Sequence, residues 1–551
     1  MELRGAEIVL ECLKKEGVDT IFGYPGGAVI PLYDALYGYR EDFTHITTSH
    51  EQGAAHGADG YSRSTGKVGV CFTTSGPGAT NIVTGVATAY ADSIPLVIIT
   101  GQVNLDLIGR DSFQEVDITT ITLSVTKHNF LVRDVHDIAR TIGEAFRIAR
   151  SGRPGPVLVD IPKDLFTEST TYIPYIPPVD REENRHWTID GIEEICRLID
   201  NSQRPIIYSG GGVVSSNTSE ELVKLVEKGN IPVVNTLMGL GGFPRTHPLS
   251  LGLVGMHGLK ESNMAVQNSD LIVAIGARFS DRVIGRADEF GPEAKVVQID
   301  IDKAEIGKNR PIDYSLVGHM KEILNELQKG ISKRERTKWL EQIKMWKESM
   351  IHEELSWDGI KVLKSANSIL DKDTIVVTDV GQHQMWTAQH WKFIKSRTFL
   401  TSGGLGTMGY GLGAAIGAKV GNPHRPVVLV TGDGSFRMNC NELSTVSKLN
   451  LPIIILIFNN STLGMVRQWQ GMFCNGRYME TDLGDEVDFI KLGEAYGIHG
   501  VKVSDVESLD RALKKAKNSN RATIIECILP KDHMVFPMVP AGMSINNMIY
   551  N

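Results

Sequence analysis

The sequence predicts an α/β protein with three domains, each built on a doubly wound parallel sheet. Ten short runs of β-branched and other apolar residues are separated by segments of helical length. The runs are apolar throughout and do not alternate with polar residues, which is typical of parallel strands covered on both faces. At roughly 150 residues per domain, the 551 residues predict three to four domains. The predicted strands are residues 68–73, 95–100, 157–161, 205–208, 271–275, 295–301, 374–378, 426–430, 452–458 and 523–527.

Two stretches divide the chain. Residues 167–186 are rich in proline and then in charge, which favours an extended linker. Residues 332–357 show a charged helical pattern between two strand-rich regions, and we expect this helix to pack outside the sheets. The predicted segments are a first domain at 1–170, a linker at 171–187, a central domain at 188–340, a helical linker at 341–373 and a last domain at 374–551.

Composition argues against several classes of protein. The net charge of −8 gives no overall attraction to nucleic acid or to an anionic membrane. Six cysteines without a CxxC pair argue against a zinc ribbon or a disulfide framework. Residues 1–20 predict an amphipathic helix, and the longest apolar run, residues 451–458, is too short to cross a bilayer. We expect a cytoplasmic enzyme. The lack of an Arg/Ser-rich leader argues against organelle import, unless the sequence is that of a mature form.

The segment 427–460 places two polar clusters directly after two buried strands. Because open α/β sheets bind ligands at the carboxyl ends of their strands, Asp433 and Asn460 are expected to converge on one cation. Oxygen ligands of this kind suit Mg²⁺ shared with a diphosphate. A turn with a capping asparagine is the alternative, and it is the better interpretation of the first cluster alone. The residues expected to approach the diphosphate are Gly432, Gly434 and Ser435.

The same segment carries a family resemblance. Its spacing from GDG to NN matches the thiamine diphosphate signature, and GMVRQWQ (464–470) resembles the large catalytic subunit of acetohydroxyacid synthases, also called acetolactate synthases. The resemblance runs nearly end to end. Its other motifs are FGYPGGAVIPLYDALY (22–37), HEQGAAHGADGYSRSTGKVGVCFTTSGPGATN (50–81), DSFQEVDI (111–118), KHNF (127–130), SGRPGPVLVDIPKD (151–164), GMHG (255–258), IGARFSDRVIG (275–285), DIDKAEIGKN (300–309) and FPMVPAG (536–542).

This resemblance implies the thiamine-diphosphate-binding fold, with thiamine diphosphate, Mg²⁺ and FAD as cofactors. Enzymes of the family decarboxylate pyruvate and join the two-carbon unit to a second pyruvate or to 2-oxobutyrate. The products are 2-acetolactate or 2-aceto-2-hydroxybutyrate, which lead to valine, leucine and isoleucine. The resemblance also implies a homodimer or tetramer with the active site at the subunit interface, and a separate small regulatory subunit.

Glu51 is the candidate for activating the thiamine cofactor. It opens an Ala/Gly-rich helix, where burial would favour the neutral carboxyl that must share a proton with the aminopyrimidine. A helix-start glutamate favoured by the helix dipole is the alternative from this residue alone. The resemblance selects the cofactor role and places this glutamate and the diphosphate site in neighbouring subunits. The resemblance also implies cofactor contacts from Gly27, Gln382, His383, Gln384, Gly406, Met408, Leu463, Gly464 and Met465, with Thr462 as a third magnesium ligand.

The glycine-rich segment 402–417 predicts a close approach of backbone to a flat ligand. Met408 lies between these glycines. By resemblance it props the cofactor into a bent shape, whereas a lone methionine more often fills a core.

The central domain carries an FAD-like pattern. Residues 210–215 give only a partial GxGxxG. The motifs GMHG and RFSDRV are stronger evidence for FAD. In this interpretation Asp300 would hold the ribose hydroxyls, and Arg278 and Arg282 would contact the diphosphate. A Rossmann-like domain without its ligand is the alternative. His319 stands where the family has an acidic residue, which predicts a weaker hold on FAD. The resemblance assigns to FAD Arg153, Gly211, Gly212, Met256, His257, Gly276, Arg278, Asp281, Arg282, Asp300 and Ile301.

Two side chains are expected to select the second substrate. Arg278 offers a fork for its carboxylate; service to the flavin, or to both flavin and substrate, is the alternative for this arginine. Trp469 would shape the pocket for the extra methyl of 2-oxobutyrate, a contact worth about 1–3 kcal/mol. Gln114 and Lys163 complete the predicted catalytic set of Glu51, Gln114, Lys163, Arg278 and Trp469. Phe113 and Val380 match active-site positions too, with core packing as the equal alternative.

Three other functions compete with this interpretation. The nearest is another thiamine enzyme, either a flavin-free catabolic acetolactate synthase or a 2-oxoacid decarboxylase that releases acetaldehyde. A flavin oxidoreductase would explain the central domain alone and predicts flavin reduction during turnover. A non-catalytic scaffold leaves Glu51, Asp433 and Asn460 without a role.

Overall fold

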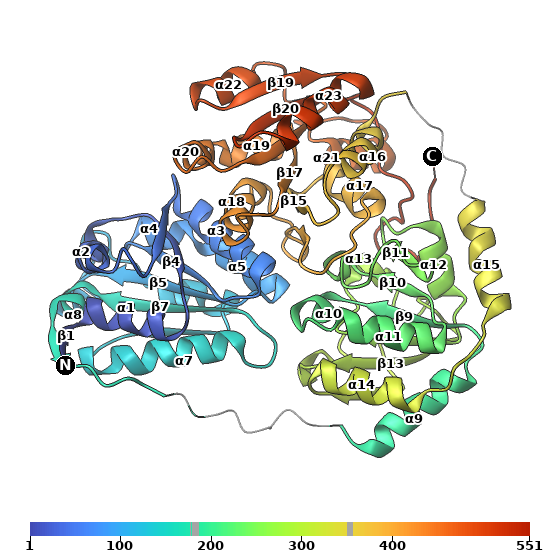
Figure 1. Cartoon of the computed structure of the whole chain (residues 1–551), viewed down its shortest axis with the longest axis horizontal. Coiled ribbons are helices and arrows are strands. Elements are labelled where there is room, and N and C mark those ends of the chain that lie inside the picture. Colours follow the sequence, from blue (N-terminus) through green and yellow to red (C-terminus); the bar gives the residue numbers. More distant parts are fainter. Residues whose placement is uncertain (177, 179–186, 350–355, 551) are drawn as a thin grey trace.

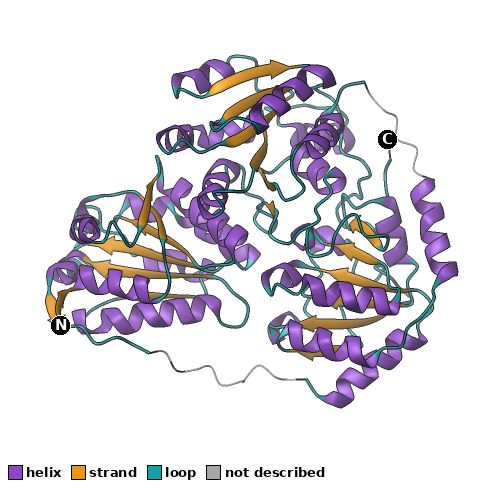
Figure 2. Cartoon of the chain, in the orientation of Figure 1, coloured by secondary structure: helices purple, strands orange, loops and turns teal. Residues whose placement is uncertain are grey.

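The computed structural model describes residues 1–176, 178, 187–349 and 356–550 and arranges them in three lobes (Figure 1). Each lobe has a six-stranded parallel sheet, and Figure 2 shows the strands lying between layers of helices. The predicted α/β class with three doubly wound sheets is therefore confirmed. Of the linker predicted at residues 171–187, residues 177 and 179–186 lie outside the described residues.

The N lobe has the strand order β3-β2-β4-β5-β7-β6. One prediction here is wrong: the first residues are not helical, because β1 (Glu2–Arg4) pairs antiparallel with β8 (Ser169–Thr171) and the helix begins at Gly5. The strands are β2 (Thr20–Gly23), β3 (Thr44–Thr47), β4 (Gly69–Thr73), β5 (Leu96–Gln102), β6 (His128–Leu131) and β7 (Pro156–Pro162), and the α-helices are α1 (Gly5–Lys15), α2 (Ile30–Gly38), α3 (Glu51–Thr65), α4 (Pro77–Asn81), α5 (Val83–Asp92), α6 (Ile118–Thr122), α7 (Ile138–Arg150) and α8 (Lys163–Thr167).

The central lobe has the order β11-β10-β9-β12-β13-β14. The charged helix predicted outside the sheets is α15, which packs on α12 and buries Trp339 and Ile343. The strands are β9 (Pro205–Ser209), β10 (Val233–Asn235), β11 (Ser250–Leu253), β12 (Leu271–Ile275), β13 (Lys295–Asp300) and β14 (Tyr314–Val317), and the α-helices are α9 (Ile189–Asn201), α10 (Gly211–Ser215), α11 (Ser219–Gly229), α12 (Lys260–Gln267), α13 (Asp281–Ile284), α14 (Met320–Gly330) and α15 (Thr337–Glu348).

The C lobe has the order β16-β15-β17-β18-β20-β19. The two strands that follow β15 in the chain therefore lie on opposite sides of it, first β16 and then β17. A ligand site is expected where the order reverses, at the carboxyl ends of β15 and β17. The strands are β15 (Ile375–Thr378), β16 (Phe399–Leu400), β17 (Val427–Gly432), β18 (Ile453–Asn459), β19 (His499–Val503) and β20 (Thr523–Ile528), and the α-helices are α16 (Gly359–Ile369), α17 (Gln382–His390), α18 (Gly411–Gly421), α19 (Asp433–Asn439), α20 (Leu443–Lys448), α21 (Gly464–Phe473), α22 (Phe489–Ala495) and α23 (Val506–Lys517).

Helices α3 and α18 join the N and C lobes through glycines. A Cβ built on Gly417 would lie 1.8 Å from the carbonyl oxygen of Gly57, and one built on Gly60 would lie 2.1 Å from that of Ala414. Both contacts are to backbone, which cannot move aside as a side chain can. The sequence therefore needs glycine here for the two helices to touch.

Gly417→Ala should destabilise the protein by about 3 kcal/mol, because the added methyl would force α18 away from α3. The matched control is Gly38→Ala at the end of α2, where an added Cβ meets nothing within 4 Å. Thermal unfolding of both variants checks this. Equal unfolding temperatures for the two would contradict the close packing.

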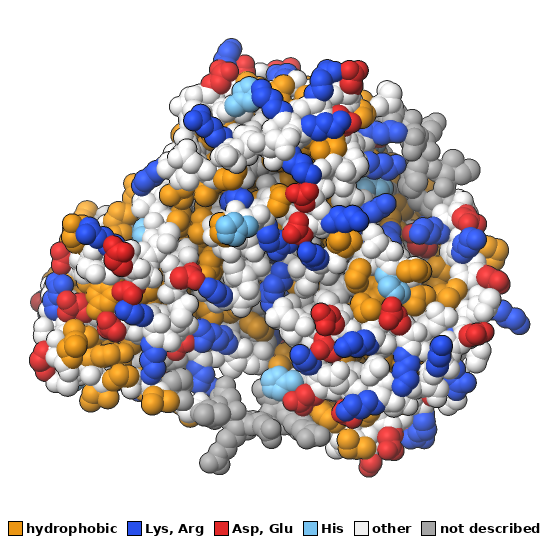
Figure 3. Space-filling view, in the orientation of Figure 1, with side chains coloured by type: hydrophobic (Ala, Val, Ile, Leu, Met, Phe, Trp, Pro, Cys, Tyr) orange, Lys and Arg blue, Asp and Glu red, His pale blue; other side chains and the backbone are white. Residues whose placement is uncertain are grey.

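The visible face in Figure 3 carries Lys/Arg and Asp/Glu side chains intermixed, as expected for a net charge of −8. All six cysteines are free thiols in the structure. Within the described ranges, no helix combines the length and apolar character needed to cross a membrane.

Candidate active site

A pocket lies at the carboxyl ends of β15, β17 and β18 in the C lobe, where the sheet order reverses. It gathers most of the predicted thiamine and metal residues. A larger cavity of about 520 Å³ lies between α20, β19 and α23, and none of the predicted site residues lines it. The pocket is lined by Val380, Gly381, Gln382, His383, Trp386, Met408, Gly432, Asp433, Gly434, Ser435, Phe458, Asn460, Thr462, Leu463, Gly464, Met465, Val466 and Leu529.

Three side-chain oxygens here fit a magnesium ion. Asp433 begins α19 and is only 2% exposed, and its Oδ2 is buried without a hydrogen-bond partner, as is the Oγ1 of Thr462. Burial raises the pKa of Asp433 to about 7, because the loss of water around the carboxylate outweighs the attraction of the Arg437 guanidinium. The Asn460 Oδ1 accepts from the Thr462 backbone N–H at 3.3 Å. No cluster of three His, Cys, Asp or Glu side chains forms a metal site in the described residues, but Mg²⁺ accepts amide and hydroxyl oxygens around a single carboxylate.

Gln382 and His383 open α17 beside these oxygens. The Gln382 side-chain amide donates to Gln468 Oε1 at 3.0 Å and to the His533 carbonyl at 2.9 Å. Its own oxygen accepts from the Asn460 side-chain amide at 3.4 Å. Burial lowers the pKa of His383 to about 3, so its ring is neutral near pH 7. Its Nε2 has no partner, which leaves a polar ring atom available to a diphosphate oxygen.

Glycines let the pocket wall close. A Cβ on Gly464 would lie 2.1 Å from Gln382 Oε1. The Met408 Cε lies 3.9 Å from a Cβ built on Gly434, so this methionine projects over the GDG turn and lines the pocket. Two other predicted residues lie elsewhere: Gln384 donates to Thr401 Oγ1 at 2.7 Å, and Gly406 is exposed with a left-handed φ of 73°.

Glu51 lies in the N lobe and does not line this pocket. It begins α3 and is half-buried, where the prediction expected a buried carboxyl. Its Oε2 accepts from the Asn81 side-chain amide at 2.9 Å. Sequence reasoning missed Asn81, although the motif that ends with it was recognised. Gly27, also assigned to the cofactor, is exposed at the carboxyl end of β2.

The remaining catalytic candidates occupy exposed or half-buried positions. Phe113 is 88% exposed, which excludes the core-packing alternative for it. Its neighbour Gln114 has a left-handed φ of 60°, and Lys163 is exposed at the start of α8. Val380 lines the pocket and is not a core residue.

Trp469 lies on α21, the helix that follows Asn460 in the chain. The Arg282 guanidinium of the central lobe lies 5.9 Å from its ring centroid, and Phe473 packs edge-on against it at 5.9 Å. The indole nitrogen is buried without a partner. Trp469 therefore lies where the C and central lobes meet.

The predicted flavin residues gather at the carboxyl ends of β9, β12 and β13. Gly212 donates its N–H to the Gly276 carbonyl at 3.0 Å, and a Cβ on Gly212 would lie 2.6 Å from Gly276 Cα. Burial raises the pKa of Asp300, at the end of β13, to about 6. The Ser209 hydroxyl and His257 Nδ1 are buried without partners. An acidic group and two unpartnered polar atoms at this edge fit a polar ligand such as FAD.

The arginines assigned to FAD contact protein groups. Arg153 pairs with Glu305 at 2.7 Å and donates to the Ser93 hydroxyl at 2.7 Å. Arg278 donates to the Ala91 carbonyl at 2.9 Å. These three partners place both arginines at the end of α5, between the N and central lobes. Four further predicted positions are Gly211 in α10, Met256 before α12, Asp281 at the exposed start of α13 and Ile301 after β13, and His319 is exposed before α14.

The three sheets and the polar pocket at the carboxyl ends of β15, β17 and β18 indicate the class of protein. Family models described as thiamine pyrophosphate enzyme, N-terminal TPP binding domain, central domain, and C-terminal TPP binding domain match residues 3–121, 192–327 and 379–527 respectively. These matches identify a thiamine pyrophosphate-dependent enzyme.

Curated relatives narrow the class. The probable acetolactate synthase large subunit of Methanocaldococcus jannaschii is 46% identical over 99% of this chain and 95% of its own. The acetolactate synthase isozyme 2 large subunit of Escherichia coli is 43% identical over 99% of each chain. The acetolactate synthase large subunit of Haemophilus influenzae is 42% identical over 100% of this chain and 98% of its own. The chain therefore belongs to the family of acetolactate synthase large subunits.

Proposed function

We propose that this protein decarboxylates pyruvate and ligates the two-carbon unit to a second 2-oxoacid, giving 2-acetolactate or 2-aceto-2-hydroxybutyrate. This is the first common step toward the branched-chain amino acids. The observation that carries the proposal is the pocket in which Asp433, Asn460 and Thr462 present oxygens below Met408. The identity to acetolactate synthase large subunits over the whole chain supports the same reaction.

The residues of the pocket and three residues outside it are each proposed to have a role. Asp433, Asn460 and Thr462 would hold Mg²⁺, and neutral His383 with the α19 N-terminus would hold the diphosphate. When bound, thiamine diphosphate supplies the electron sink for decarboxylation. Glu51 holds a proton at the aminopyrimidine. Arg278 and Trp469 orient the second 2-oxoacid, which a simple decarboxylase does not need to bind.

FAD is proposed as a further cofactor of the central lobe, bound along β9, β12 and β13. The protein is proposed to act in the cytoplasm with a small regulatory subunit, as the large-subunit names of its relatives indicate. Incubation of the purified protein with pyruvate, Mg²⁺ and thiamine diphosphate should form acetolactate, and EDTA should abolish this until Mg²⁺ is restored. Colourless protein with full activity would favour the flavin-free alternative.

Trp469→Leu should lower the ratio of acetohydroxybutyrate to acetolactate about tenfold, because a methyl contact is worth about 1–3 kcal/mol. Competition between pyruvate and 2-oxobutyrate, with both products quantified, measures the ratio. Phe473→Leu, which changes the ring packed against Trp469, is the matched control. An unchanged ratio in Trp469→Leu would remove this residue from specificity.

A site shared between two subunits makes a quantitative prediction. Glu51→Gln and Asp433→Asn chains should each be inactive alone. When the two chains are coexpressed, every mixed dimer contains one site with both residues native. Because about half of the dimers are mixed and each has one working site, activity should recover to about a quarter of the native value. No recovery in purified mixed dimers would place both residues in the site of one chain.

A further inference from the structure

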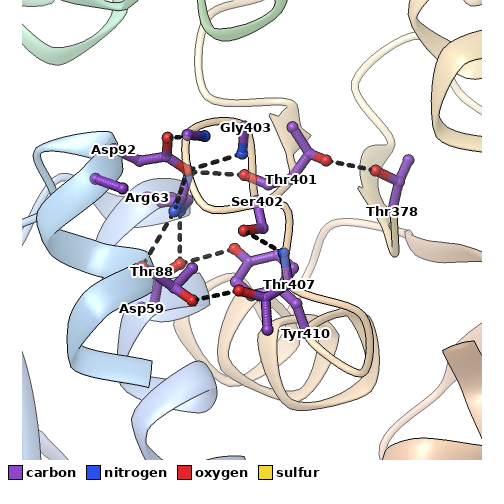
Figure 4. Close-up of polar contacts among 12 residues, drawn as sticks. Asp59, Arg63, Thr88, Asp92, Thr378, Thr401, Ser402, Gly403, Thr407 and Tyr410 are labelled. Atoms are coloured by element: carbon purple, nitrogen blue, oxygen red, sulfur yellow. Dashed lines mark hydrogen bonds and ion pairs between the residues drawn. The ribbon is translucent and has the colours of Figure 1, made fainter. Parts of the chain in front are cut away.

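The glycine-rich loop, residues 401–410, carries Met408 into the pocket. Side chains of the N lobe of the same chain contact this loop and hold it in place (Figure 4). Asp92, the last residue of α5, accepts from the backbone N–H groups of Gly403 at 3.0 Å and Gly404 at 2.7 Å. The Asp92 side chain is fully buried. Figure 4 shows its carboxylate facing the loop. A turn without side chains is thus fixed through its backbone.

Arg63 of α3 connects this aspartate to both ends of the loop. Its guanidinium bonds Asp59 at 2.5 Å, Asp92 at 2.9 Å and the Thr401 carbonyl at 2.9 Å. At the far end of the loop, the Tyr410 hydroxyl donates to Asp59 Oδ1 at 2.7 Å. The Arg63 side chain is only 5% exposed and that of Asp59 is fully buried. Only a planar fork can reach all of these partners at once.

A second set of contacts lies next to Met408. Thr407 donates its backbone N–H to Ser402 Oγ at 3.0 Å, and its hydroxyl lies 2.8 Å from that of Thr88 in α5. Thr407 directly precedes Met408 in the chain. The backbone of Met408 is therefore fixed from one side by its own loop and from the other by α5.

Such a network is an inefficient way to obtain stability. Removing charges from water is costly, and buried ion pairs are often replaceable by apolar residues without loss of stability. What this network does provide is directional contact at the start, the turn and the end of the glycine-rich loop. Its geometric effect falls on the one side chain of the loop that lines the pocket.

We propose that Arg63 and Asp92 are positioning residues that fix Met408 over the pocket before the cofactor binds. The proposal rests on the proposed function, because it takes the pocket to be the thiamine diphosphate site. The N lobe thereby shapes the cofactor pocket of its own chain, in addition to supplying Glu51 to the proposed site of the neighbouring subunit. Neither residue touches the pocket itself.

The test uses full-length Arg63→Lys and Asp92→Asn. The matched controls are Arg140→Lys and Asp137→Asn, which alter an exposed ion pair of the same lobe. Hydrogen exchange of the cofactor-free proteins should show the Gly403 and Gly404 amides exchanging at least about tenfold faster in the two test variants. The apparent KM for thiamine diphosphate should rise about tenfold, with kcat at saturating cofactor within about twofold of native. The controls should match the native protein in all three quantities.

Native exchange in the loop together with a native KM for the cofactor would overturn the proposal. So would a fall in kcat alone, because a merely structural defect leaves fewer active molecules with unchanged cofactor affinity. If Arg63→Lys fails to fold, Ser402→Ala keeps the ion pairs and removes only the acceptor for the Thr407 N–H; it should shift exchange and KM in the same direction. If the native protein binds no thiamine diphosphate, the proposed function fails, and the exchange result still reports on the loop.

Discussion

Glu51→Gln should lower acetolactate formation by about a thousandfold and leave the protein folded. Glutamine keeps the size of the side chain and can still accept from the Asn81 amide, which is bonded to Glu51 at 2.9 Å. It cannot hold and share a proton with the aminopyrimidine, and proton transfer by a positioned side chain is worth about 10²–10⁴ in rate. Steady-state formation of acetolactate from pyruvate measures the loss.

Glu41→Gln is the control for this variant, because Glu41 is an exposed carboxylate of the same lobe. It should retain native activity. The unfolding temperatures of both variants should stay close to that of the native protein. A Glu51→Gln protein that turns over pyruvate at the native rate would remove Glu51 from the mechanism.

Asp433→Asn should weaken Mg²⁺-dependent binding of thiamine diphosphate by at least about a hundredfold and should stabilise the cofactor-free protein. The loss follows because Asp433 is the only carboxylate among the three proposed ligands. The gain in stability follows because burial raises the pKa of Asp433 to about 7, which means that its charged form is disfavoured in the folded, cofactor-free protein. Calorimetric titration and thermal unfolding of the cofactor-free protein measure the two effects.

The sign of the stability change follows from linkage. The pKa of Asp433 in the folded protein lies above its ordinary value. The free-energy cost of ionising the buried carboxylate is therefore small at low pH and grows until the pH passes about 7. The advantage of Asp433→Asn should therefore be larger at pH 8 than at pH 5. Glu507→Gln, at a carboxylate that is 84% exposed, is the control and should change neither quantity. Native cofactor affinity in Asp433→Asn would refute the proposed metal site.

Much of the fold was predictable because the central strands of each sheet are continuous apolar runs. All ten predicted strands are present, with ends within two residues. The strands that were missed in the three large sheets are their six edge strands and two interior strands, β2 and β10, of four and three residues. Strands this short give no apolar run that can be distinguished from a helix or a turn.

The candidate site, like the fold, was predictable only in part. The polar clusters at Asp433 and Asn460 follow predicted strands, so topology alone brings them together. The contacts of Arg63 had no such signal, because its partners Asp92 and Thr401 lie 29 and 338 residues away. Arg278 was recognised by its motif, but its contact with Ala91 depends on how the N and central lobes pack, which no local pattern encodes.

Product analysis tests the central claim most directly. Purified protein with Mg²⁺, thiamine diphosphate and FAD is given isotopically labelled pyruvate, with and without 2-oxobutyrate, and all products are identified. The account predicts 2-acetolactate from pyruvate alone and added 2-aceto-2-hydroxybutyrate when 2-oxobutyrate is present. Acetaldehyde as the main product would show a decarboxylase and would contradict the proposed carboligation.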